Sequence, residues 1–147
     1  MRYSIVSIGQ LKRGFYKDAA EHYQKRLAAF SKLEAIELKN KFSNTAQESS
    51  ALLAAAKGYR IALDEAGEGL SSQLWAERID RLEQRGTPHI SFLIGGADGH
   101  SPELKRQVES CWSLSPLTFA HDLAKLVLLE QLYRCETIRS NHPYHRN

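Results

Sequence analysis

The residues best suited to chemistry lie in three segments of the chain's second half. The first is a glycine-rich turn at residues 93–99 (LIGGADG), directly after an apolar run of strand length. Glycines let a ligand approach the backbone and tolerate positive φ angles, and in open α/β sheets ligands bind at the carboxyl ends of strands. The segment matches neither GxGxxG nor a P-loop, so a triphosphate site is not supported. A ligand-binding loop and a plain strand-to-helix turn both stay open.

The second segment, residues 112–121, joins a short strand to the last helix of the predicted fold. Its backbone amides are suited to binding the edge of a purine. His121, just before the helix, is suited to act as an acid, a base or a substrate contact, or alternatively to cap the helix at the surface. Glu130 and Arg134 follow four residues apart, which favours either an i,i+4 surface ion pair or contacts to a ligand or a second subunit.

The third segment is the C-terminal sequence SNHPYHRN at residues 140–147. Its histidines, tyrosine and arginine suit contacts to phosphate and stacking on bases; the alternative is a frayed polar end. His142 and His145 have the spacing of metal ligands, but neither a cysteine nor a carboxylate accompanies them nearby, so we expect no metal site.

Strands and helices that position these segments alternate along the chain. We expect strands at 3–8, 33–38, 60–63, 90–94 and 112–114, and helices at 15–30, after a Thr45-x-x-Glu48 capping box, after Ser71 or Ser72, after Ser101-Pro102, and at 123–138. Alternation of this kind predicts an α/β fold with a mostly parallel sheet covered by helices on both faces. The whole chain, residues 1–147, is expected to form a single domain.

The amino-acid composition argues against several classes of protein. The chain of 147 residues is 42% hydrophobic and 25% charged, with a mean hydropathy of -0.44, which argues against disorder. It has no apolar run long enough for a membrane helix, and its first residues do not resemble a signal peptide. Two widely spaced cysteines suit a reducing cytoplasm. A net charge of +3 permits an anionic partner without requiring one.

Four motifs taken in order resemble one family: LIGGxxG at 93–99, WSLSxLTxxH at 112–121, LYR at 132–134 and the terminal NHPYHR at 141–146. They are similar to those of the ribosomal large-subunit methyltransferase H family, of the SPOUT class. The resemblance implies an S-adenosylmethionine-dependent enzyme that methylates N3 of pseudouridine 1915 in helix 69 of 23S rRNA, within the assembled 70S ribosome. It also implies a homodimer and a C-terminal trefoil knot that holds the cofactor.

The resemblance also assigns roles to individual residues. It implies cofactor contacts from Leu63, Gly96, Ser115, Pro116, Leu117, Thr118, Phe119 and Ala120. For catalysis it implies His121 and Glu130 as candidates for proton handling, with Arg134, Tyr144 and Arg146 holding the nucleotide and its phosphate, and His142 and His145 as further substrate contacts. At Gly96, a Cβ is expected to intrude on the bound cofactor.

Two other classes stay open beside this enzyme. A non-catalytic ribosome- or RNA-binding module of the same fold would keep the tail but need no adenosine pocket. A flavodoxin-like enzyme would carry a phosphate loop after the first strand, yet residues 9–14 (GQLKRG) show no Ser/Thr-rich cradle. The last helix carries more apolar residues than one face of a sheet needs, which favours a homodimer: Leu123, Leu126, Val127, Leu128, Leu129, Leu132, Tyr133 and Ile138.

Overall fold

The computed structural model describes residues 1–146, apart from the side chain of Arg146. Its strands are β1 (Arg2–Ile8), β2 (Lys32–Leu38), β3 (Tyr59–Gly69), β4 (His89–Ile94) and β5 (Ser110–Ser113). Its helices are α1 (Phe15–Leu27), α2 (Thr45–Ala55), α3 (Ser72–Gln84), α4 (Pro102–Gln107), α5 (His121–Arg139) and the 3-10 turn η1 (Pro143–Arg146).

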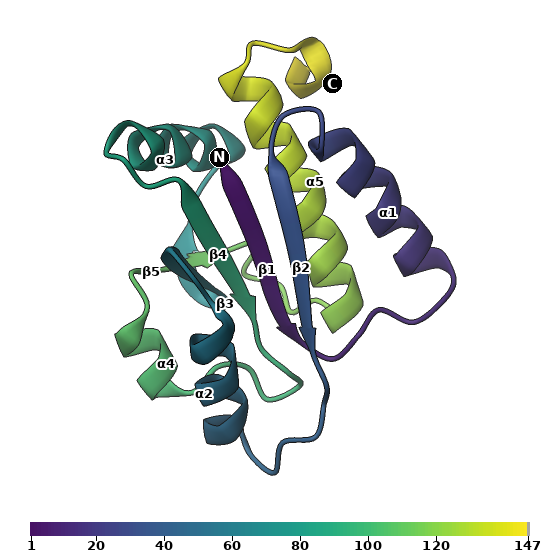
Figure 1. Ribbon diagram of the computed structural model, residues 1–147, viewed down its shortest axis with the longest axis vertical. Coiled ribbons are helices and arrows are strands. Elements are labelled where there is room, and N and C mark those ends of the chain that lie inside the picture. The colour runs from purple at the N-terminus through teal and green to yellow at the C-terminus, as the bar shows by residue number, and fades with distance from the viewer. Residues whose placement is uncertain (147) are drawn as a thin grey trace.

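The five strands form one sheet in the order β2-β1-β4-β3-β5, and every neighbouring pair is parallel. The strands β1, β2 and β4 therefore end at the same edge of the sheet, the lower edge in Figure 1. We call this the carboxyl edge and the opposite one the amino edge. The predicted α/β fold with a parallel sheet is confirmed.

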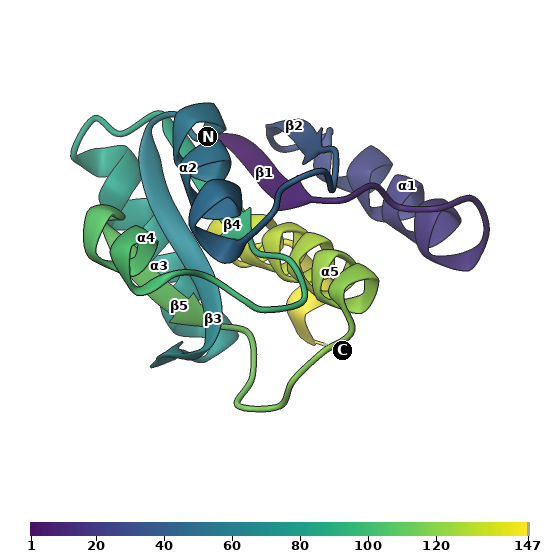
Figure 2. The ribbon, with the colours of Figure 1, turned by 90° about the horizontal axis from the view of Figure 1, so that it is seen from below.

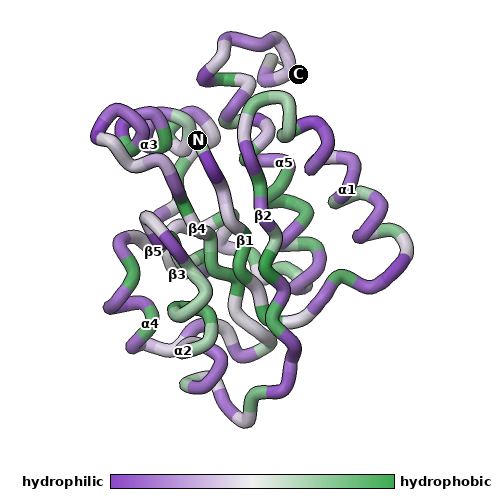
Figure 3. The backbone as a smooth tube through the Cα atoms, in the orientation of Figure 1, coloured by the Kyte–Doolittle hydropathy of each residue, from purple (hydrophilic) through white to green (hydrophobic). Residues whose placement is uncertain are grey.

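Two hydrophobic cores lie on the two faces of the sheet. Helices α1, α3 and α5 cover one face, where Ile5, Phe92 and Leu128 are buried together. Helices α2 and α4 cover the other, where the alternate strand residues Val6 and Leu93 are buried. Figure 2, which looks at the carboxyl edge, shows α5 and α2 on opposite sides of the sheet. Hydrophobic residues gather in the strands and along α5, whereas much of α3 is hydrophilic (Figure 3).

Three aromatic side chains fix α3 on the sheet. Trp75 from α3 stacks on Phe92 of β4 with ring centroids 5.8 Å apart, and meets Trp112 of β5 edge-on at 4.9 Å. All three are almost completely buried. Offset stacked and edge-to-face rings contribute beyond the burial of their area. This cluster therefore stabilises the side of the sheet where β3 and β5 lie next to each other.

The structure corrects three element boundaries. The third strand runs from Tyr59 to Gly69 and does not end after Leu63; an irregularity in its pairing with β5 lies between Leu63 and Glu68. The second helix is capped by Asn44, whose side chain accepts a hydrogen bond from the Gln47 N–H at 2.9 Å, and not by Thr45. The last helix begins at His121 and not at Leu123, so it includes that histidine.

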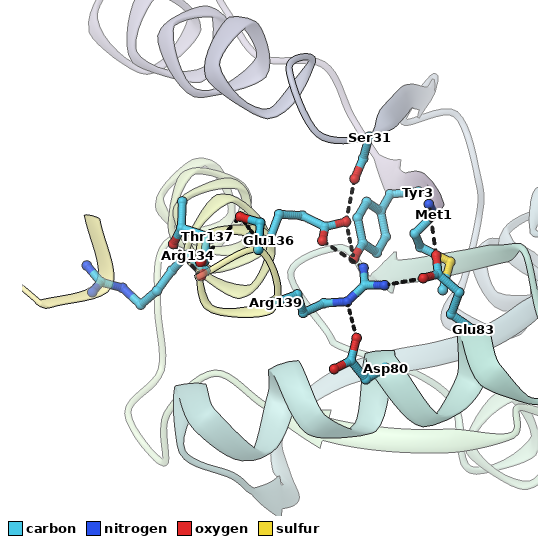
Figure 4. Close-up of polar contacts among 10 residues, drawn as sticks. Met1, Tyr3, Ser31, Asp80, Glu83, Arg134, Glu136, Thr137 and Arg139 are labelled. Atoms are coloured by element: carbon cyan, nitrogen blue, oxygen red, sulfur yellow. Dashed lines mark hydrogen bonds and ion pairs between the residues drawn. The ribbon is translucent and has the colours of Figure 1, made fainter. Parts of the chain in front are cut away.

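A buried ionic network holds the end of α5 at the amino edge (Figure 4). Glu136 is only 4% exposed. It accepts hydrogen bonds from the Tyr3 hydroxyl at 3.2 Å and from the Ser31 hydroxyl. Arg139, three residues on, donates to it at 2.7 Å. Burial and the neighbouring carboxylate of Glu136 raise the pKa of Tyr3 well above its usual value, so its hydroxyl stays a donor.

The same arginine joins α5 to α3. Arg139 pairs with Asp80 at 2.6 Å and with Glu83 at 2.6 Å, and the α-amino group of Met1 lies 3.2 Å from the second carboxylate of this pair. One guanidinium therefore ties together the last helix, the third helix and the first strand.

Removal of the arginine alone should be costly, because it leaves a carboxylate buried without its cation. We expect Arg139→Leu to lower the free energy of unfolding by about 3–5 kcal/mol in urea denaturation. The double variant Glu136→Leu/Arg139→Leu buries no unpaired charge and should lose clearly less. Equal losses in the two variants would contradict this account of the network.

Candidate functional site

A cavity of about 570 Å³ opens at the carboxyl edge, where ligands bind in parallel α/β sheets. Its walls come from the end of β3, the turn after β4, the loop after β5 and the start of α5. The residues that line it are Leu63, Asp64, Glu65, Ala66, Ile94, Gly95, Gly96, Ala97, Asp98, Gly99, His100, Lys105, Leu114, Ser115, Leu117, Thr118, Phe119, His121 and Ala124. Its volume is typical of a site for a small molecule or cofactor.

The glycine turn forms one wall and is itself tightly closed. The Gly99 N–H donates to the Gly96 carbonyl at 3.0 Å, and Gly99 has a φ of 73°, which favours glycine. A Cβ at Gly95 would lie 2.9 Å from the backbone of Gly99, so any larger residue there would displace the turn. The turn is therefore tight, and it also lines the cavity; that it binds a ligand stays a prediction.

A Cβ at Gly96 would first meet a side chain of the protein itself. It would lie 2.7 Å from the Glu48 carboxylate on α2. A substitution at this glycine would thus displace Glu48, whereas its predicted clash with a bound cofactor stays a prediction.

The loop after β5 is held against the end of β3 by side-chain hydrogen bonds. The Thr118 hydroxyl donates to the Glu65 carboxylate, and the Ser113 hydroxyl donates to the Ser115 carbonyl at 2.8 Å. The Leu117 N–H donates to the Ser115 hydroxyl at 3.0 Å. These contacts fix the loop's shape and so the wall it presents to the cavity.

Most of the predicted cofactor contacts meet at this cavity. Leu63, Gly96, Ser115, Leu117, Thr118 and Phe119 line it, and so does His121. Pro116 and Ala120 belong to the same loop without lining the cavity. The structure thus brings together segments that lie up to 58 residues apart in the sequence, from Leu63 to His121.

Polar cavity residues escaped the sequence analysis, among them Asp64, His100 and Lys105. Asp64 and Lys105 form an ion pair at 2.9 Å. Burial opposes ionisation of Asp64, but hydrogen bonds from Lys105 and the Ala66 N–H lower the pKa of its carboxyl. His100 is 7% exposed, and its Nε2 lies 2.9 Å from the Leu93 carbonyl. Two signals in the sequence could have found these residues. His100 directly follows the glycine turn, and Asp64 lies near the end of the buried part of a strand.

His121 is half-buried at the start of α5. Its Nε2 has no hydrogen-bond partner among the described residues, and its Nδ1 lies 3.6 Å from the Asp122 carboxylate. Burial, and then the positive charge of Lys125, lower the pKa of His121. The imidazole is therefore neutral at neutral pH and able to accept a proton.

Lys125 is itself buried and paired. It is 2% exposed, and its Nζ donates to the Gly9 carbonyl at 2.9 Å and to the Glu37 carboxylate at 3.0 Å. The same carboxylate accepts the Leu11 N–H at 2.8 Å. This pair ties the start of α5 to the loop after β1 and to the end of β2.

A second group of predicted site residues gathers farther along α5. Arg134 donates to Glu130 at 2.6 Å and 3.0 Å, and the Tyr144 hydroxyl donates to the same oxygen at 3.2 Å. The Arg134 guanidinium lies 5.1 Å from the centre of the Tyr144 ring. Burial and the Glu130 charge raise the pKa of Tyr144 to about 12, so its hydroxyl remains protonated at neutral pH. The predicted i,i+4 ion pair between Glu130 and Arg134 is therefore present, and Tyr144 of the tail hydrogen-bonds to it.

The described part of the tail is packed and not frayed. The Tyr144 ring meets Tyr133 of α5 edge-on at 4.6 Å, and His142 meets Phe30 at 6.0 Å. His145 is half-buried, and its Nδ1 has no hydrogen-bond partner among residues 1–146. The predicted contacts from the side chain of Arg146 lie outside the described residues.

Within one chain the two groups are well separated. His121 begins α5 at the cavity, and Glu130 lies nine residues on, which is about 13 Å along a helix. The tail continues away from the cavity toward the amino edge (Figure 1). One protomer therefore assembles the predicted cofactor residues, but it does not bring the predicted tail residues to them.

Among residues 1–146, no group of three or more His, Cys, Asp or Glu side chains has the geometry to hold a metal ion. No helix in that range is long and apolar enough to cross a membrane.

Comparison with known proteins identifies the class to which this fold and cavity belong. The family model described as a predicted SPOUT methyltransferase matches residues 1–145. Among solved structures, a probable methylase family protein from Haemophilus influenzae Rd KW20 superposes with a TM-score of 0.61 at 11% identity, over 99% of this chain and 70% of that chain. This second likeness concerns the fold alone.

Curated relatives define the family more narrowly. The ribosomal RNA large subunit methyltransferase H of Deinococcus radiodurans is 38% identical over 146 residues, or 99% of each chain. That of Synechococcus sp. (strain RCC307) is 43% identical over 148 residues, covering 99% of this chain and 95% of the relative. The chain belongs to the ribosomal RNA large subunit methyltransferase H family of SPOUT methyltransferases, as its motifs predicted.

The environment of His121 predicts how it titrates. We expect its pKa, measured by NMR titration, to lie below 6.5 and to rise in Lys125→Met, because the protonated imidazole then loses a repelling neighbour while Glu37 loses its partner. Lys57→Met, which removes an exposed cation at the amino edge, is the matched control and should leave the pKa unchanged. An unchanged or lower pKa in Lys125→Met would contradict the electrostatic account.

Proposed function

We propose that this chain transfers a methyl group from S-adenosylmethionine to N3 of pseudouridine 1915, in helix 69 of 23S rRNA, on the assembled 70S ribosome in the cytoplasm. Membership of a family of ribosomal RNA large subunit methyltransferases supports rRNA as the substrate class. The observation that carries the proposal is the cavity at the carboxyl edge, formed by the glycine turn and the loop after β5.

The residues present fit the cofactor of this class. S-Adenosylmethionine supplies an activated methyl group on a sulfonium, so the protein need only hold it and aim it. The cavity has a suitable volume and a wall of glycine backbone. It also has two buried imidazole nitrogens, Nδ1 of His100 and Nε2 of His121, which lack hydrogen-bond partners in the described part of the chain. We assign cofactor binding to this turn and to residues 115–120 of the loop.

The chemistry required of the chain's own residues is proton removal and alignment. N3 of pseudouridine is an imide nitrogen that is neutral at pH 7, and it attacks well only as its proton leaves. The neutral His121, at the cavity wall, is suited to take that proton, a role that typically contributes 10²- to 10⁴-fold in rate. Alignment of N3 with the methyl–sulfur bond supplies a further large part of the acceleration.

Glu130 is less suited to be the base. It lies in a hydrogen-bonded ion pair with Arg134, and the Tyr144 hydroxyl also donates to it. We propose that it positions these two side chains, which together with His142, His145 and Arg146 hold the target nucleotide. Phosphate and base are recognised by arginine forks and aromatic faces.

The separation of the two groups calls for a second copy of the chain. We propose a homodimer with a C-terminal trefoil knot, in which the tail of one protomer reaches the cavity of its partner. Leu123, Leu126 and Val127 of α5 support the dimer, because they stay only partly buried within one chain.

The direct test is methyl transfer from labelled S-adenosylmethionine to 70S ribosomes from a strain that lacks this modification. We expect label at pseudouridine 1915 and none on ribosomes already modified there. A non-catalytic ribosome-binding module would bind ribosomes but show neither cofactor binding in calorimetry nor label in rRNA.

The role of the tail is tested by deleting residues 144–147. We expect the dimer and the cofactor Kd to be preserved, while kcat/KM for ribosomes falls by orders of magnitude, because the lost contacts act on substrate and transition state. Tyr144→Phe keeps the ring on Tyr133 and removes only the hydroxyl, so it should retain more activity than the deletion. Near wild-type kcat/KM in the deletion would show that the tail lies outside the site.

A further inference from the structure

Six exposed side chains form a basic and aromatic surface at the carboxyl edge, apart from the cavity and the tail. We call it the edge patch. Its members are Lys12, Arg13, Phe15 and Lys17 from the loop after β1 and the start of α1, and Lys39 and Lys41 from the loop after β2. The two segments are neighbours: the Gly9 N–H donates to the Leu38 carbonyl at 2.6 Å, and the Leu11 N–H donates to Glu37 at 2.8 Å.

The edge patch concentrates positive charge. Residues 9–17 and 38–43 hold five of the chain's twenty lysines and arginines and none of its seventeen acids, so the rest of the chain has a net charge of -2. None of the five cations forms an ion pair within 4.0 Å among residues 1–146. The nearby acids are Asp18 and Glu21, both exposed on α1, and Glu37, which is paired with Lys125. The cations are therefore available to an anionic partner.

An exposed aromatic ring stands among these cations. Phe15 is 73% exposed, and its ring meets Tyr16 edge-on at 5.1 Å. A solvent-exposed aromatic ring between Arg13 and Lys17 in the sequence buries little apolar area and so adds little to the stability of the fold. Its free face has the shape and chemistry of a platform for a nucleic-acid base.

Contacts connect the edge patch to the cavity. Gly9 opens the loop that carries Lys12 and Arg13; its carbonyl accepts from Lys125, and a Cβ built on it would lie 4.0 Å from the His121 ring. Lys12 is three residues farther on, a span of at most about 11 Å of chain. RNA whose target base enters the cavity would pass this surface.

We propose that the edge patch binds the sugar-phosphate backbone and one unpaired base of the substrate RNA, on the strand next to the methylated nucleotide. The inference rests on the proposed function and deepens it, because it assigns a docking surface to the rRNA. Five unpaired cations match the charge of consecutive phosphates, and Phe15 offers the stacking face that unpaired loops use.

The test compares two sets of full-length variants. The patch variant is Lys12→Ala/Arg13→Ala/Lys17→Ala, and the control, Lys32→Ala/Arg85→Ala, removes exposed cations from the amino edge. We measure the cofactor Kd by calorimetry, methyl transfer to unmodified 70S ribosomes, and the salt dependence of binding to ribosomes and to protein-free 23S rRNA. We expect the patch variant to keep the cofactor Kd, to raise KM much more than it lowers kcat, and to reduce the slope of log K against log salt by about 2.

A single substitution isolates the stacking contact. Phe15→Ala should weaken binding to ribosomes by roughly 5- to 100-fold, the usual effect of losing one stacked base, while Phe15→Trp should retain most of the affinity.

The outcomes separate the patch from the proposed function. Wild-type protein that binds ribosomes but transfers no methyl group would refute the proposed function, while the salt slopes would still decide the docking surface. An unchanged slope in the patch variant, or an equal loss in the amino-edge control, would overturn the docking surface. Loss of affinity for ribosomes without loss for protein-free rRNA would show that the patch contacts a ribosomal protein instead, and would overturn it as well.

Discussion

Helix α5 is held at both ends by buried charged side chains, and the layout of the site follows from that. Near its start, Lys125 is paired with Glu37 under the carboxyl edge; near its end, Glu136 and Arg139 are paired above the amino edge. Removing one partner of such a buried pair is destabilising, because the remaining charge stays buried without a counter-charge or water. The helix is therefore fixed against the sheet at both ends, and its rise of about 1.5 Å per residue sets the distance between His121 and Glu130.

The separation along α5 is the reason for proposing that two copies of the chain share the work. His121 faces the cavity, whereas the tail packs on the far half of the same helix through Tyr133 and Tyr144. In the proposed homodimer, a twofold axis would bring the second group from the partner copy to the cavity.

The fold was largely readable from the sequence, because strands buried on both faces are apolar runs and the intervening helices carry clear caps. The third strand was misjudged where it meets β5: residues 64–68 are polar because that stretch is an irregular, partly exposed edge, and the polarity predicted a loop. Motifs located most of the cavity wall. His100 and Lys105 were missed because only the folded turn brings them there, and the distance between His121 and the tail is likewise invisible in a linear motif.

The clustering of cations at one edge of the sheet also could not be predicted from the linear sequence. The net charge of +3 is modest, and along the sequence the loop after β1 and the loop after β2 look like ordinary polar connections. Parallel topology places both at one edge, so their cations add, while the acids they lack are distributed over the rest of the chain. Electrostatic attraction to RNA depends on this local density more than on the net charge, since screening at physiological salt limits each charge to a range of about 8 Å. The proposed docking surface would thus lie at the same edge of the sheet as the cavity.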